Sequence, residues 1–250
     1  MSDADRTEAV PDTFRTYAAD RPDARFTEWL RARAEPDWSS AVEHPFVKEL
    51  AGGTIDDGVF RRYLLQDYAF LDALVGAFGY AVGDAAGMDA RSQLVDFLAV
   101  LTDDEDGYFE RSFEALEVSE SVYAHPEPTD TTRAFEDLLG RAAREGGYAE
   151  TLAVLVPAEW VYLSWAEAHV DAEPGAFYLR EWIDLHANDG FRSFVGWLRE
   201  ELDREGAAAS PRRQARLDRS FRRTVELEVD FFETAYRDDS RQSSGGEREW

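Results

Sequence analysis

Apolar residues recur at intervals of three and four along most of this chain. Between Phe60 and Leu71, for example, apolar or aromatic side chains stand at positions 60, 63, 64, 68 and 71. This spacing forms one apolar stripe on an α-helix, and few segments alternate as a half-buried strand would. The pattern predicts an all-α protein, a single bundle of about eight helices.

Capping and turn residues set the expected helix boundaries. Thr54-Ile55-Asp56-Asp57 has the form of a capping box, with Asp in place of the usual Glu, and predicts a helix from there to about Gly83. Pairs such as Gly52-Gly53 and Gly146-Gly147 separate neighbouring helices. The other helices are expected over residues 25–51, 88–115, 130–145, 148–170, 175–186, 188–205 and 211–237.

The two ends of the chain differ from its middle. Residues 1–24 are acidic and weakly apolar, and residues 238–250 are polar and rich in Gly and Ser. We predict a flexible acidic arm and a disordered tail around one helical domain at 25–237. The acidic start is not followed by an apolar stretch, and no apolar run approaches the ~20 residues of a membrane span. We therefore expect a cytoplasmic protein without a membrane partner.

Charge is the least ordinary feature of the composition. There are 52 acidic residues against 27 basic ones, for a formal net charge of −25, and Lys48 is the only lysine. Such an excess of carboxylate keeps a protein hydrated when salt screens ordinary repulsion. It indicates a halophilic cytoplasm, with an acidic mesophile as the alternative. It also argues against a nucleic-acid partner, because phosphate contacts need a basic surface.

One segment near the C-terminus is locally basic. Arg212, Arg216, Arg219 and Arg223 would share one face of a helix. They form either an anion-binding stripe or a solvated face that pairs with the protein's own carboxylates. We favour the second interpretation, because charge runs are usually solvated surface.

The chain contains no cysteine and four histidines. The first fact excludes disulfides, cysteine-ligated zinc and thiolate catalysis. Of the histidines, only His186 could join Asp67, Glu159 and Glu228 in a metal site, and this is weak support. We expect no metal and no cofactor.

Two carboxyl groups interrupt apolar helix faces. Asp67 shares its side of the helix with Tyr63 and Phe70, and Glu228 lies between Val225 and Phe231. A buried Asp67 could hydrogen-bond an amidine-like edge of a heterocycle, or it could be salt-bridged within the bundle. Desolvation would raise the pKa of Glu228 and suit it to general acid–base chemistry, unless it is an exposed helical Glu.

Four separated segments resemble the signatures of one family. They are His44-Pro45-Phe46-Val47, Tyr63-Leu64-Leu65-Gln66-Asp67-Tyr68, Val156-Pro157-Ala158-Glu159-Trp160-Val161-Tyr162, and the stretch from Glu228 to Tyr236. In this order they resemble the TenA family, thiaminase II or aminopyrimidine aminohydrolase, over residues 25–237. The resemblance implies a heme-oxygenase-like helical bundle, a homotetramer, and a small-molecule aminopyrimidine as ligand.

The resemblance also implies roles for three matching residues. Asp67 would bind the amino side of the pyrimidine, Glu228 would be the acid and base, and Tyr162 would line the ring pocket. At four other pocket positions the chain departs from the family pattern. Ala158 stands where thiaminases have the nucleophilic cysteine, and Phe70, Phe135 and His186 stand where the family has tyrosines.

Alanine cannot act as a nucleophile, so another group must replace the thiol if the protein is an enzyme. A cysteine-free branch of the family is associated with a glutamate near that position. Glu159 is the candidate, but it lies about 100° around the helix from Ala158 and could instead face solvent or pair with an arginine. His186 is a second candidate for activating water.

Three functions follow from these observations. The first is a TenA-like hydrolase of aminopyrimidine compounds in thiamin salvage, acting without cysteine. The alternative is a non-catalytic relative that only binds a heterocycle, which Ala158 and the lost hydroxyl groups favour. A transcription-associated regulator is the third, and the net charge and the lack of a helix-turn-helix pattern argue against it.

Overall fold

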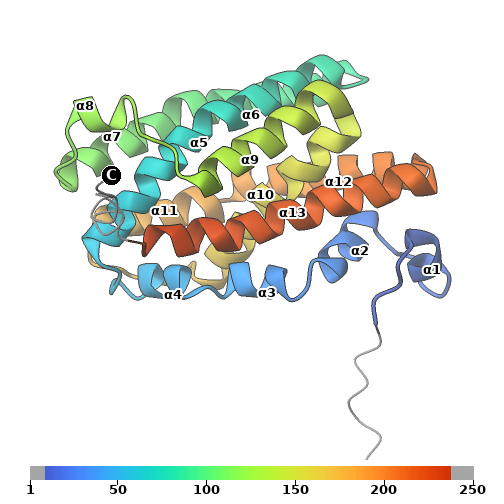
Figure 1. The fold of residues 1–250 in the computed structure, drawn as a ribbon, viewed down its shortest axis with the longest axis horizontal. Helices are drawn as coiled ribbons and strands as arrows, with labels where there is room; N and C mark the ends of the chain where they lie inside the picture. The colour runs from blue at the N-terminus through green and yellow to red at the C-terminus, as the bar shows by residue number, and fades with distance from the viewer. Residues whose placement is uncertain (1–8, 238–250) are drawn as a thin grey trace, which may run out of the picture.

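The computed structural model describes residues 9–237, and this part of the chain contains helices and no strands. The predicted all-α class is therefore confirmed. Figure 1 shows helix α13 (Pro211–Ala235) running along the molecule, with α5 (Asp57–Asp84) and α9 (Asp130–Arg141) on one side of it and α3 (Asp37–Val42) and α4 (Pro45–Ala51) on the other. The remaining helices are α1 (Phe14–Ala18), α2 (Phe26–Arg33), α6 (Met88–Val100), α7 (Asp106–Ala115), α8 (Glu120–Tyr123), α10 (Tyr148–Ala168), α11 (Phe177–Ala187) and α12 (Asp189–Ala208).

Helix α10 forms the centre of the bundle. All residues from 148 to 163 are buried, and the helix packs against α3, α5, α11, α12 and α13. A helix that is apolar on all sides can satisfy its side chains only when other helices surround it. The two acidic residues of its buried part, Glu150 and Glu159, therefore need an explanation.

Prolines divide the single helix predicted for residues 25–51 into α2, α3 and α4. Pro36 is the N-cap of α3 and Pro45 opens α4. The residue before a proline is disfavoured in helical conformation, so His44 leaves the helix and caps α4 instead, its Nδ1 accepting from the Phe46 N–H at 3.1 Å. The prediction of one continuous helix was wrong for this reason.

The start of α5 also differs from the prediction. Asp56, not Thr54, is the N-cap, and its carboxylate accepts from the N–H groups of Gly58 at 2.9 Å and Val59 at 3.3 Å. Aspartate is as good an N-cap as threonine, so the sequence alone allowed both.

Two segments have the wider π-helical turn. The helix predicted for 88–115 consists of α6, a π-turn η1 (Leu101–Glu105) and α7, and α9 continues into a second π-turn, η2 (Ala142–Gly146). A π-turn shifts the side chains that follow it around the helix axis, and such turns are frequent at functional sites.

The N-terminal region is only partly described. From residue 9 onward it contacts the bundle: the Trp29 Nε1–H donates to the Pro11 carbonyl at 2.9 Å, and Phe14 on α1 packs edge-on against Phe26. Residues 1–8 of the predicted arm and the predicted tail at 238–250 lie outside the described residues. Among the described helices, none has the length and apolar character needed to span a membrane.

Candidate active site

A cavity lies where α5, α6, η1, α9, α10, α11, α12 and α13 meet. The empty space in it measures about 700 Å³, including the part open to solvent. Aromatic and aliphatic side chains form most of its wall. Its titratable lining consists of Asp67, Glu105, Glu159, Tyr162, His186 and Glu228.

Three consecutive residues of α5 connect this helix to three different parts of the site. Successive residues of an α-helix point about 100° apart, so Gln66, Asp67 and Tyr68 face separate neighbours. Asp67 lines the cavity. Gln66 binds the start of α9, and the Tyr68 hydroxyl donates to the Asp106 carboxylate at 3.0 Å, where η1 passes into α7.

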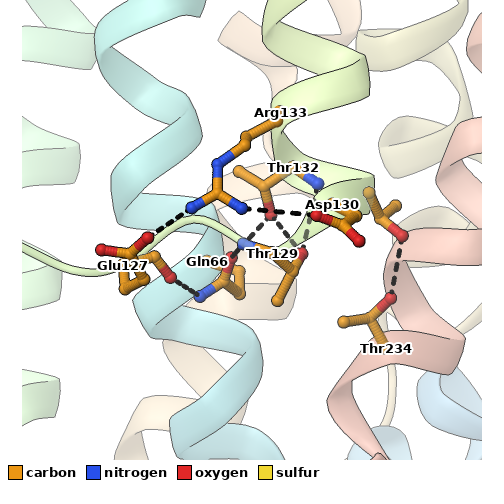
Figure 2. Close-up of polar contacts among 8 residues, drawn as sticks. Gln66, Glu127, Thr129, Asp130, Thr132, Arg133 and Thr234 are labelled. Atoms are coloured by element: carbon orange, nitrogen blue, oxygen red, sulfur yellow. Dashed lines mark hydrogen bonds and ion pairs between the residues drawn. The ribbon is translucent and has the colours of Figure 1, made fainter.

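Figure 2 shows the contacts of Gln66 with the start of α9. Its amide nitrogen donates to the Glu127 carbonyl at 3.1 Å, and its amide oxygen accepts from the Thr129 N–H at 2.8 Å and the Thr132 hydroxyl at 2.6 Å. The side chain thus holds α9 against α5. It fixes the position of Phe135, which lies one turn after Thr132 and lines the cavity.

The pKa of the Asp67 carboxyl is raised well above its usual value by burial, and further by the nearby Glu105. Neither a hydrogen bond nor an ion pair to another described residue compensates this group. Asp67 itself is half-buried on the wall of the cavity. A desolvated carboxyl group without a partner costs free energy, so Asp67 is available to a ligand rather than used by the fold.

Ala158 and Glu159 on α10 both line the cavity. Ala158 is 5 % exposed and Glu159 7 % exposed. The Glu159 carboxyl neither faces solvent nor pairs with an arginine, so both of these alternatives to a position in the cavity were wrong. Burial raises its pKa well above the usual value, and Glu105 and Asp67 raise it further.

Glu228 enters the cavity from α13, between the buried Val225 and Phe231. It is only 2 % exposed and has no partner among the described residues. Burial raises its pKa well above the usual value, and Asp67 and Glu159 add to this effect. Because these carboxyl groups interact, they titrate as a cluster rather than one by one.

The Tyr162 hydroxyl is held by a second tyrosine, Tyr63, which is not among the predicted site residues. The hydroxyl oxygens of Tyr162 and Tyr63 lie 2.8 Å apart. Burial raises the pKa of both phenols well above 10, so both stay protonated. One hydroxyl donates to the other, and the second keeps its O–H free for a ligand. Tyr63 stands one turn before Asp67 on the same side of α5, and this spacing was the signal that it lies near the site.

His186 lines the cavity from α11. Its Nδ1 is 2.9 Å from the Trp182 carbonyl oxygen, which can only accept, so Nδ1 carries the proton and Nε2 has a free lone pair. Burial lowers the pKa of His186 to about 4. The imidazole is therefore neutral at physiological pH, an acceptor and a weak base rather than a cation.

Phe70 and Phe135 form one wall, with ring centroids 4.6 Å apart, and Phe231 lies 6.3 Å from Phe70. These rings supply flat apolar surface at positions where hydroxyl groups would supply hydrogen bonds. The wall suits an aromatic heterocycle that stacks or packs edge-on.

Glu105 is the cavity residue that the sequence did not reveal. It lies in a run of acidic residues at positions 103–106 that has the composition of a solvated helix face. Its side chain lies in the π-turn η1 and lines the cavity, and burial raises its pKa to about 8. Its spacing of four from Leu101 agrees with this position, but the acidic run around it indicated a solvated face instead.

The arginine stripe near the C-terminus lies outside the cavity. Arg216 pairs with Glu150 at 2.9 Å and Arg223 with Glu226 at 3.0 Å, which agrees with the solvated-face interpretation of the arginine stripe. This pairing also explains the buried Glu150.

Within residues 9–237, no group of three or more histidine and acidic side chains has the arrangement of metal ligands.

The bundle belongs to a known fold class. It matches a domain of unknown function with a heme oxygenase-like fold from Shewanella denitrificans, with a TM-score of 0.62, 14% identity, and coverage of 91% of this chain and 99% of that chain. A TenA homologue from P. horikoshii OT3 matches with a TM-score of 0.77 and 27% identity, over 85% of this chain and 99% of that chain. The predicted heme-oxygenase-like bundle is thereby confirmed.

Sequence comparison identifies the family. The model of the TENA/THI-4/PQQC family matches residues 31–238. An aminopyrimidine aminohydrolase of Halalkalibacterium halodurans is 30% identical over 221 residues, covering 84% of this chain and 95% of that protein. This chain belongs to the TENA/THI-4/PQQC family, which confirms the resemblance to TenA proteins.

Proposed function

We propose that this protein is a hydrolase of aminopyrimidine compounds in thiamin salvage, and that it works without a cysteine nucleophile. The observation that carries the proposal is that Asp67, Glu159 and Glu228 face one aromatic-walled cavity without partners among the described residues. Buried acids that no protein group compensates are expected where a substrate supplies the compensation. The activity of the H. halodurans relative supports the same reaction class.

Substrate binding would use the two kinds of surface in the cavity. The Asp67 carboxylate would accept hydrogen bonds from the amino group and a protonated ring nitrogen of an aminopyrimidine. Phe70 and Phe135 would contact the ring face, and Tyr162, held by Tyr63, would donate a hydrogen bond at the ring edge.

Hydrolysis would need one acid and one base, and the cavity offers both. The acid form of Glu228 would give its proton to a ring nitrogen and draw electrons from the exocyclic carbon. Glu159, or His186 through Nε2, would take a proton from water as the water oxygen bonds to that carbon. The carbon–nitrogen bond breaks in the same step as the carbon–oxygen bond forms, because this saturated carbon already has four bonds. Ammonia leaves with the proton taken from water, and the ring proton returns to Glu228.

A heterocycle-binding protein without catalysis is the second candidate. Ala158 at the nucleophile position, and phenylalanines at two positions where the family has tyrosines, favour it. The buried carboxyl groups favour the enzyme, because a purely apolar pocket would bind a ring without the cost of desolvating acids.

Titration calorimetry in high salt, with the hydroxymethyl- and aminomethyl-aminopyrimidines, tests both candidates when followed by an assay for ammonia from the second compound. Binding with ammonia release is the result expected of the hydrolase. Binding without release would leave the non-catalytic candidate, and no binding of either compound would overturn the proposal.

The Glu228→Gln variant tests the assigned role. It should abolish ammonia release while pyrimidine affinity stays within a few-fold, because Gln keeps the shape of Glu but cannot transfer a proton. Glu226→Gln, on the exposed side of the same helix, is the matched control and should keep full activity. Equal loss of binding and turnover in Glu228→Gln would contradict this role.

The homotetramer and the cytoplasmic location remain proposals drawn from the family. Light scattering coupled to size-exclusion chromatography would measure the mass of the assembly directly.

A further inference from the structure

Glu105 lies in the π-turn η1 and lines the cavity. Leu101, four residues earlier, lines it as well, because residues four apart share one face of a helix. The hydrogen bond from Tyr68 to Asp106, the residue after Glu105, fastens this turn to α5 next to Asp67.

The cavity has an unbalanced set of charges. Its lining has four carboxyl groups and contains no lysine or arginine. His186 is neutral near pH 7, because burial lowers its pKa to about 4. Elsewhere in the described chain a buried acid has a cation, as Asp218 has Arg33 at 3.1 Å and Glu150 has Arg216 at 2.9 Å. The acids of the cavity lack such a partner.

An independent observation indicates that a ligand completes this set. Glu228 is 2 % exposed, lines the cavity, and has no hydrogen-bond or ion-pair partner among the described residues. A side chain buried to this degree retains a carboxyl group at a high cost unless something else pairs with it. A ligand that enters the cavity would supply this missing partner.

We propose that Glu105 is a substrate-binding residue that, with Asp67 and Glu159, makes the cavity selective for a ligand carrying a positive charge over its neutral analogue. The proposal rests on the proposed function and specifies the substrate class: a heterocycle with an ammonium or amidinium group. No covalent step is involved. One carboxylic acid of the cluster gives its proton to solvent, and the resulting carboxylate pairs with the cation of the ligand.

This binding mode predicts that cation affinity rises with pH. Burial raises the pKa of Glu105 to about 8, so below that pH the ligand must displace a proton. The affinity should increase between pH 6 and 8, by up to about tenfold per unit if one proton leaves. The groups that face Glu105 or share its cavity are Asp67 on α5, Tyr108 on α7, Glu159 and Tyr162 on α10, His186 on α11 and Glu228 on α13.

The test compares a cationic and a neutral ligand of nearly the same size. The full chain carrying Glu228→Gln, which stops hydrolysis during the titration, is titrated with aminomethyl-aminopyrimidine and with the hydroxymethyl compound. Buffers of different ionisation enthalpy report the proton released. The same titrations are repeated after adding Glu105→Gln or, as a matched control, Glu110→Gln, an exposed glutamate on α7.

We expect the parent to prefer the aminomethyl compound and to release a proton only with it. Glu105→Gln should reduce that preference by about tenfold, the effect of losing one charge-assisted hydrogen bond, and should abolish the proton release. Glu110→Gln should change neither. Thermal unfolding and the conservative Glu105→Asp variant, which should retain part of the preference, check that the fold is intact.

Three results would overturn the inference. Equal affinity of the parent for both ligands would show that the cavity does not select charge, while leaving the proposed function in place. If Glu105→Gln weakened the binding of both ligands equally, Glu105 would contribute only to the packing of the cavity. Failure of the parent and the unsubstituted chain to bind either ligand would remove the proposed function and this inference together.

Discussion

Each carboxyl group of the cavity has exchanged much of its water for aromatic and aliphatic neighbours. Burial is the main cause of the raised pKa values of Asp67, Glu105, Glu159 and Glu228, and three of them are raised further by one another's charge. The unliganded protein therefore holds protons that an exposed carboxylate would have lost. At the scale of the residue, burial therefore has two effects on each carboxyl group: it destabilises the folded protein, and it leaves the group ready to bind a cation.

Glu105 makes this cost measurable as a function of pH. Its pKa rises from 4.5 to about 8 in the folded chain, so its contribution to stability is fully present below about pH 4.5 and is lost as the pH rises from there through 8. Glu105→Gln removes this dependence. It should make the ligand-free protein more stable at pH 8.5 by about 1–3 kcal/mol, with a smaller effect at pH 5.5.

Chemical denaturation of Glu105→Gln at the two pH values, with Glu110→Gln beside it, measures this difference. Lower stability of Glu105→Gln at pH 8.5 would mean that the carboxylate has a partner in the folded state.

At the scale of the element, the site depends on how α5 joins its neighbours. Gln66, Asp67 and Tyr68 have different functions because they point in different directions: to α9, into the cavity, and to the start of α7. A substitution at Gln66 would therefore affect the site through the position of α9 rather than through contact with the ligand. Figure 2 shows the ion pairs of the neighbouring Arg133 with Glu127 and Asp130, whose side chains are exposed.

Gln66→Leu should lower the free energy of unfolding by about 1–3 kcal/mol, because it leaves the Glu127 carbonyl and the Thr129 N–H without their partner. Ligand affinity should fall as well, since Phe135 loses its fixed position. Arg133→Ala is the control, and loss of its exposed ion pairs should cost less than about 1 kcal/mol.

Denaturation curves and ligand titrations of both variants measure these effects. A Gln66→Leu protein with unchanged stability and affinity would show that α9 is held by packing alone.

At the scale of the whole molecule, the net charge of −25 opposes folding, because compaction brings like charges together. Salt bridges at the surface offset little of this unfavourable free energy, since exposed pairs contribute about 0–1 kcal/mol each. The protein should therefore depend on screening by salt.

The midpoint of thermal unfolding should rise as KCl increases from 0.1 to 2 M, because the Debye length falls from about 10 Å to less than 3 Å. Thermal denaturation monitored by circular dichroism measures the midpoint, and a matched concentration of sucrose separates screening from general exclusion of solute. A midpoint that falls with KCl would contradict the halophilic interpretation.

The sequence by itself determined the class of fold, the family and part of the site. Periodicity identified the long helices, because a helix must bury one face and the spacing of apolar residues records that face. The same logic exposed Asp67 and Glu228 as carboxyl groups on apolar faces. The order of four short segments was enough to recognise the family.

Tertiary structure alone decided which residues meet. It turned Glu159 into the cavity, paired Tyr162 with Tyr63, and neutralised His186 through burial. It also placed Glu105 in the cavity, although the acidic run around this residue has the composition of a solvated face. The physical reason is the same in each case: periodicity describes one helix, whereas burial and pKa are set by all the helices that surround a side chain.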